Sequence, residues 1–140
     1  MMWRKPEQDL FPMCDELGIG FMAYSPLGNG FLSGKVAQNT EYQEGDFRGM
    51  MGRFKPEVMA QNQALLDLIA QIAATKNATS AQVVLAWGLA QKPYIVPIPG
   101  TTKLHRLEEN FKGAEVELSA QELADINNAL AKLDINETFF

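Results

Sequence analysis

The sequence contains a single cysteine, a single histidine and no long hydrophobic run. Because Cys14 has no second cysteine to pair with, no disulfide can form within the chain, and this favours a reducing cytoplasm as its location. No uninterrupted apolar stretch approaches the roughly 18 residues that are needed to span a bilayer. The opening residues 1–6 are not followed by the apolar region of an export signal. We therefore expect a cytoplasmic protein without a membrane segment.

Positive charge is also scarce, since 12 Lys and Arg residues face 17 Asp and Glu residues, for a formal net charge of −5. An acidic chain lacks the basic surface that general nucleic-acid binding requires. Local basic residues could still hold one small phosphate group. Hydrophobic residues make up 46% of the chain and charged residues 21%, which is enough apolar material for a globular core. No metal site is predicted.

The hydrophobic pattern predicts a chain that is mostly helical. Helical spacing is found in the stretches 6–17, 59–73, 79–89, 103–111 and 119–133. Gly18 is placed to end the first helix. Thr79 with Gln82, and Ser119 with Glu122, form capping boxes that predict the start of two others.

Two short apolar runs, 19–24 and 94–99, are typical of strands that are buried on both faces. Helices separate them, and this order is typical of parallel βα units. Two strands cannot close a sheet alone, and small sheets are marginal in water. The sequence therefore predicts an α/β fold that is part of a larger α/β barrel.

The segment 24–35, YSPLGNGFLSGK, directly follows the first predicted strand, where parallel α/β folds bind ligands. Its glycines would allow backbone N–H groups to approach a phosphate closely. Ser25 offers a hydroxyl, Lys35 a positive charge, and Tyr24 a ring that can lie against a flat heterocycle. The alternative is a surface loop with flexible glycines, because glycine-rich loops are weak signals.

The segment 97–110, PIPGTTKLHRLEEN, follows the second predicted strand and opens a helix. Helix N-termini attract anions through their free N–H groups and the macrodipole. We expect Thr101 and Thr102 to cap the helix and bind phosphate, and Arg106 to make a two-pronged phosphate contact with Lys103 nearby. Glu109 and Asn110 could bind an adenine edge. The alternative is a capped helix with solvated charges.

These two segments, in this order, resemble the C-terminal portion of the aldo-keto reductase family. Supporting pieces are ELGIG at 16–20, GDFR at 45–48 and SAQVVLAW at 80–87, so the resemblance covers essentially the whole chain. It implies a single partial domain, residues 1–140, that forms the C-terminal half of a (β/α)8 TIM barrel with two recognisable parallel strands. Members of the family transfer a hydride from NADPH to an aldehyde or ketone, so the implied partners are NADP(H) and, in an intact barrel, a small carbonyl substrate.

The resemblance also implies a role for particular residues. Tyr24 would stack on the nicotinamide. The pyrophosphate would be bordered by Ser25, Pro26, Leu27, Asn29 and Lys35. The 2′-phosphate would be held by Gly100, Thr101, Thr102 and Arg106, and the adenine by Glu109 and Asn110. Many relatives carry lysine where this sequence has Gly100, so we expect one phosphate contact to be missing and NADPH to bind less tightly.

The family's chemistry needs an Asp, a Tyr, a Lys and a His whose motifs are absent here. We therefore expect no catalytic residue in this chain and no activity of the chain alone, and we interpret His105 as a helix-surface residue. Met1 resembles an internal methionine of the family, as in a truncated product, a mis-called reading frame or a cut fragment. The loop 31–56 and the tail 136–140 are expected to border the substrate pocket. The alternative function is a helical interaction module that self-associates or pairs with a separate N-terminal half.

Overall fold

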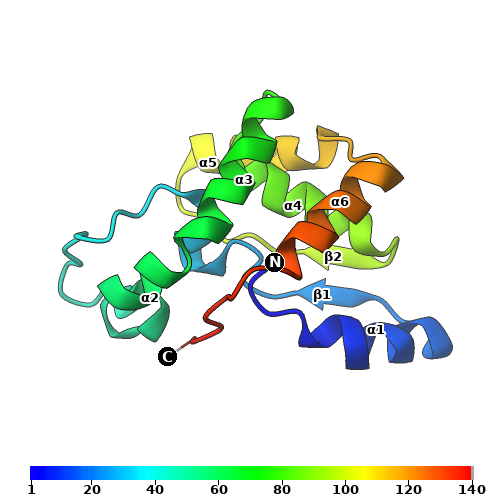
Figure 1. Ribbon diagram of the computed structural model, residues 1–140, viewed down its shortest axis with the longest axis horizontal. Coiled ribbons are helices and arrows are strands. Elements are labelled where there is room, and N and C mark those ends of the chain that lie inside the picture. Colours follow the sequence, from blue (N-terminus) through cyan, green and yellow to red (C-terminus); the bar gives the residue numbers. More distant parts are fainter. Residues whose placement is uncertain (140) are drawn as a thin grey trace.

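The computed structural model describes residues 1–139, which form two short strands and the helices that pack against them (Figure 1). The elements, with η for a 3-10 helix, are α1 (Lys5–Leu17), β1 (Phe21–Ala23), η1 (Gly28–Ser33), η2 (Phe47–Met50), η3 (Gly52–Phe54), α2 (Pro56–Gln61), α3 (Gln63–Thr75), α4 (Ser80–Gln91), β2 (Ile95–Pro97), α5 (Leu104–Phe111), η4 (Lys112–Glu115) and α6 (Ala120–Leu130).

The strands β1 and β2 are parallel neighbours, as the sequence predicted, with Met22 opposite Val96. The prediction that both faces are buried was wrong. Met22 is 67% exposed and Val96 58% exposed, whereas Ile95, which points the other way, is 5% exposed. Side chains alternate between the two faces of a strand, and the helices of this chain cover one face only. The sheet therefore has one packed face and one open apolar face.

Local signals placed three helix ends correctly, namely the end of α1 and the starts of α4 and α6. Gly18 ends α1 in the left-handed conformation with φ 63°. Both predicted capping boxes are present: the Thr79 hydroxyl accepts from the Gln82 N–H at 3.3 Å, and the Ser119 hydroxyl accepts from the Glu122 N–H at 3.2 Å. These side chains satisfy N–H groups that have no partner inside the helix.

The single helix predicted over 59–73 is in fact two, α2 and α3, which meet at Asn62. Asn62 is only 1% exposed, and its side chain pairs with the backbone of the C-terminal tail. Its amide donates to the Asn136 carbonyl at 3.0 Å and its oxygen accepts from the Asn136 N–H at 2.9 Å. The last helix, α6, also ends at Leu130 rather than at Leu133. The break between α2 and α3 therefore depends on the C-terminal tail, which lies far from Asn62 in the sequence.

The core lies where α3 and α4 pack against η1, the turn that follows β1. Its most deeply buried hydrophobic side chains are Phe31, Met51, Leu65, Ile69 and Val83. Phe31 and Met51 come from residues 25–56, a stretch that is rich in glycine and contains the 3-10 helices η1, η2 and η3. Within residues 1–139 no helix is long and apolar enough to cross a membrane, and no group of three or more His, Cys, Asp or Glu side chains could hold a metal ion.

Candidate functional site

The two predicted ligand segments lie on opposite walls of one cavity of about 700 Å³, which we call the polar groove. Every predicted site residue lines it: Tyr24, Ser25, Pro26, Leu27, Asn29, Lys35, Gly100, Thr101, Thr102, Arg106, Glu109 and Asn110. The parallel pairing of β1 with β2 explains this, because parallel strands place their following loops at the same edge of the sheet. The structure thus brings the set together, while its role in holding a cofactor stays a prediction.

The first wall is a tight turn held by its own hydrogen bonds. Ser25 and Asn29 adopt left-handed backbone conformations, with φ 49° and φ 59°, and the Ser25 hydroxyl donates to the Asn29 side-chain oxygen at 3.1 Å. The Gly28 N–H donates to the Ser25 carbonyl at 2.9 Å. Phe31, just beyond, is 1% exposed and anchors the turn in the core. These contacts favour a formed binding wall over a loosely held surface loop. Tyr24 is 75% exposed, so its ring is open to a ligand.

The second wall is the connection from β2 to the start of α5. The prediction that Thr101 and Thr102 cap this helix was wrong, because α5 begins at Leu104 and its N-cap residue is Lys103, with no side-chain cap. The Thr101 hydroxyl instead accepts from the Lys103 N–H at 3.1 Å and shapes the turn before the helix. Within the described part of the chain, no side chain accepts from the N–H groups of Leu104 and His105, the first two residues of α5, and these groups can receive an anion.

Gly100 lies at the open end of this wall. A Cβ built on Gly100 would meet no atom within 4 Å, and its φ is not in the left-handed region. Nothing in the surrounding structure requires glycine here. A longer side chain would point into free space at the edge of the groove.

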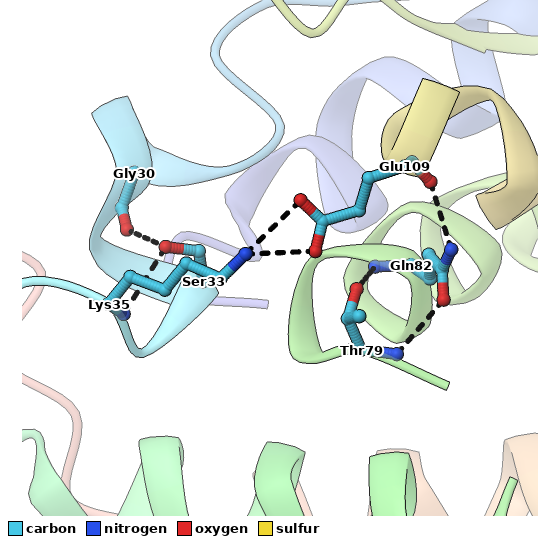
Figure 2. Close-up of polar contacts among 6 residues, drawn as sticks. All are labelled: Gly30, Ser33, Lys35, Thr79, Gln82 and Glu109. Atoms are coloured by element: carbon cyan, nitrogen blue, oxygen red, sulfur yellow. Dashed lines mark hydrogen bonds and ion pairs between the residues drawn. The ribbon is translucent and has the colours of Figure 1, made fainter. Parts of the chain in front are cut away.

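An ion pair joins the two walls. Figure 2 shows the Lys35 ammonium reaching the Glu109 carboxylate, at 3.0 and 3.2 Å from its two oxygens. The Gln82 side chain, held in its capping box, donates to the Glu109 backbone carbonyl at 3.1 Å and ties α4 to α5. Burial acts to raise the pKa of the Glu109 carboxyl, but the Lys35 ammonium and the Thr79 hydroxyl outweigh it and lower the pKa. No sequence pattern indicated that Lys35 and Glu109, both predicted to contact the cofactor, bind each other.

Further cations line the polar groove. Among residues 1–139 no hydrogen bond or ion pair holds the Arg106 side chain, so its charge is available to a ligand. Arg48, which the sequence interpretation did not assign to the site, also lines the groove and forms a two-pronged pair with Asp46. The GDFR motif at 45–48 was the signal that could have identified it. The groove is therefore cationic within an acidic protein, and this suits a phosphate-bearing ligand.

A second cavity of about 700 Å³ shares Tyr24, Ser25 and Pro26 with the polar groove but is otherwise mostly apolar, and we call it the apolar cavity. Its other lining residues include Met1, Met2, Trp3, Phe11, Arg53, Trp87, Glu137 and Phe139. The η3 helix and the tail, both expected to border a substrate pocket, meet here, although Phe140 lies outside the described residues. That role stays a prediction. His105 is exposed on α5, as expected.

The chain matches known proteins over nearly its whole length. The model of the aldo/keto reductase family matches residues 1–131. The aldo-keto reductase yakc of Schizosaccharomyces pombe, whose name carries NADP(+), is 38% identical over 131 residues, which are 94% of this chain and 38% of the relative. The chain therefore spans well under half the length of this relative.

Solved structures of related reductases agree with this match. A thermostable aldo-keto reductase crystallised with the inhibitor epalrestat superposes with a TM-score of 0.59 at 29% identity, covering 91% of this chain and 36% of that one. The aldose reductase of Giardia lamblia gives a TM-score of 0.59 at 26% identity, covering 94% and 35%. The two parallel strands and their helices thus form part of a TIM barrel. The family model, the relative and the solved structures agree, and the chain belongs to the aldo/keto reductase family.

Proposed function

We propose that this chain is the NADP(H)-binding part of an aldo-keto reductase. One observation carries the proposal: two segments that are more than 60 residues apart, each predicted to contact the cofactor, line a single cationic groove. The relative yakc is named for NADP(+), which agrees with this chemistry. NADPH, when bound, would supply the hydride for carbonyl reduction.

The groove residues fit the parts of NADPH. The uncapped start of α5, with Thr101, Thr102 and the unpaired Arg106, would hold the 2′-phosphate. The backbone of the Ser25–Asn29 turn would border the pyrophosphate, and the exposed Tyr24 ring would stack on the nicotinamide. On cofactor binding, the Lys35–Glu109 ion pair would either open or stay formed and lie across the bound cofactor.

We also propose that the chain alone does not reduce carbonyl compounds. The Asp, Tyr, Lys and His that act in the family have no matching motifs in this sequence. A small aldehyde or ketone would be reduced only where an intact barrel provides those residues. The expected result is no NADPH oxidation above background when the purified chain is mixed with an aldehyde.

Thermal unfolding with NADPH tests the cofactor proposal directly. A ligand that binds only the folded state, present at about a hundredfold over its Kd, adds roughly 2.7 kcal/mol to the free energy of unfolding. We expect NADPH to raise the Tm, NADH to raise it less, and Arg106→Gln to remove the difference between them. The control is Lys132→Gln, which also removes one positive charge but at an exposed position. A cooperative transition at the same Tm with and without NADPH would contradict the proposal.

The second candidate function is an interaction module, and the open face of the two strands favours it. Met22 and Val96 are register partners, and both are more than half exposed on that face. Exposed apolar faces of this kind mark contact sites with other chains. Sedimentation equilibrium of the pure chain distinguishes the cases: a dimer that Met22→Ser dissociates supports self-association, and a monomer at all concentrations contradicts it.

A further inference from the structure

Arg53 is a buried cation whose function neither the fold nor the polar groove explains. It lies on η3 between the buried residues Met51 and Phe54, and it is only 7% exposed. Its guanidinium carbon lies 4.2 Å from the centre of the Phe139 ring, and its Nη1 lies close over Gly28, 3.1 Å from where a Cβ would be. The guanidinium therefore packs against the Phe139 ring and occupies the space that the missing side chain of Gly28 leaves.

Within residues 1–139 the charge of Arg53 has no counter-ion. Its Nε is fully buried without a hydrogen-bond partner, and among residues 1–139 no ion pair with a carboxylate is formed. Burying a charge without a partner is unfavourable, and burial accordingly lowers the pKa of Arg53 although the group stays protonated. Two carboxylates line the same cavity, but Glu7 is bound by Arg4 at 2.6 Å and Glu137 is exposed. The Arg53 side chain also lines the cavity, so a ligand there can supply the counter-ion that the described residues do not provide.

The position of Arg53 favours a substrate group over a cofactor phosphate. Arg53 lines the apolar cavity and not the polar groove, where other cations are available for phosphates. The apolar cavity meets the polar groove at Tyr24, the residue proposed to stack on the nicotinamide. Apolar side chains such as Trp87 and Phe139 line it, and they suit a hydrophobic ligand body. A planar guanidinium matches a carboxylate with two parallel hydrogen bonds.

We propose that Arg53 is a specificity-determining residue that binds the carboxylate of the substrate, so that the intact reductase prefers aldehydes or ketones with an apolar body and a carboxylate. This inference rests on the proposed function for the substrate's identity as a carbonyl compound. The carboxylate site itself is a property of this chain and can be tested without catalysis.

The probes are benzoate and benzamide, which have nearly the same shape but differ in charge. The ¹⁵N-labelled chain shows the Nε–H resonances of its arginines, and Arg53→Lys identifies the one that belongs to Arg53. We expect benzoate to move this resonance and benzamide to leave it unmoved. We also expect benzoate to bind at least about 10-fold more tightly than benzamide, as for a hydrogen bond to a charged group. Because this readout uses the unaltered chain, it holds even if an Arg53 variant fails to fold.

Substitutions then test whether the Arg53 side chain causes the preference for benzoate over benzamide. Arg53→Gln should abolish the preference for benzoate, whereas Lys132→Gln, an exposed change of the same charge, should preserve it. Equal binding of the two probes, a preference that survives Arg53→Gln, or no binding of either probe overturns the inference. A larger shift of the Arg53 resonance with inorganic phosphate than with benzoate would assign it to the cofactor and also overturn it.

An NADPH titration of the same samples separates the two proposals. If NADPH binds while benzoate and benzamide bind equally, the carboxylate site fails and the cofactor proposal stands. If NADPH does not bind while benzoate keeps its preference, the proposed function fails and the Arg53 site stands.

Discussion

Replacing Gly100 with lysine tests the proposal that the start of α5 holds the 2′-phosphate of NADPH. A Cβ at this position meets no atom within 4 Å, and the backbone is not in the left-handed region, so the substitution introduces neither a clash nor strain. Surface substitutions of this kind change the free energy of unfolding by less than about 0.5 kcal/mol. Any change in affinity therefore reports the new charge and not a damaged fold.

The expected gain follows from the exposure of the site. Gly100 is exposed, so a lysine there would meet the 2′-phosphate in a solvated environment, where an ion pair contributes about 1 kcal/mol or less. This corresponds to a Kd for NADPH that is up to about fivefold lower. NADH lacks the 2′-phosphate, so its Kd should not change. The gain should also shrink between about 0.1 M and about 1 M salt, as the screening length falls from roughly 10 Å to roughly 3 Å.

The assay is a fluorescence titration of NADPH and of NADH against the wild-type chain and Gly100→Lys. Ala60→Lys, on the exposed side of α2, adds the same charge away from the groove and is the matched control. If NADH gains as much as NADPH, or if Ala60→Lys gains as much as Gly100→Lys, the 2′-phosphate does not lie at the start of α5 and the reasoning is refuted.

Three further predictions concern the framework that holds the groove. Thr79→Ala removes the cap of α4 and should lower the free energy of unfolding by about 1 kcal/mol in urea titrations, and an unchanged midpoint would contradict this. Gly113→Ala would place a Cβ 3.1 Å from the Leu85 side chain in the core and should lower the free energy of unfolding by about 1–3 kcal/mol. In the control Gly88→Ala, inside α4, the new Cβ meets no atom within 4 Å, so the protein should be equally or more stable. Equal effects of the two substitutions in thermal melts would refute the packing argument. The Lys76 ammonium and the Ser119 cap lower the pKa of Glu122 to about 2. Because the pKa is lower in the folded state, this stabilisation is present above about pH 4.5 and is lost as the pH falls toward 2. Glu122→Gln should flatten that part of the profile of Tm against pH, and an identical profile would show that the carboxylate is not involved.

Local patterns in the sequence were sufficient for much of the framework. The capping boxes at Thr79 and Ser119, and the left-handed end of α1 at Gly18, depend on residues within about one helical turn of each other, so the sequence shows them directly. The apolar runs identified both strands. Their separation by helices predicted the parallel pairing, which in turn explains why the two segments predicted to bind a ligand meet at one edge of the sheet.

Short-range reasoning failed where a distant partner decides the local structure. Asn62 ends one helix and begins another because it pairs with Asn136, 74 residues away, and periodicity alone predicted one continuous helix. Thr101 was expected to cap α5, but its hydroxyl is taken by the turn before the helix. The strands were expected to be buried on both faces, but the residues of this chain cover only one.

The sequence by itself determined the family, the parallel strands and the two segments that form the walls of the polar groove, although not Arg48, because each of them is a contiguous motif or a short hydrophobic repeat. Only the tertiary structure decided which charged groups meet. Lys35 pairs with Glu109 across 74 residues, and Arg53 is buried beside Phe139 with no counter-ion in the part of the chain that the structure describes. The physical reason is that burial and charge pairing depend on which distant segments pack together. The free energy of a charge depends on those neighbours and not on the residues beside it in the chain.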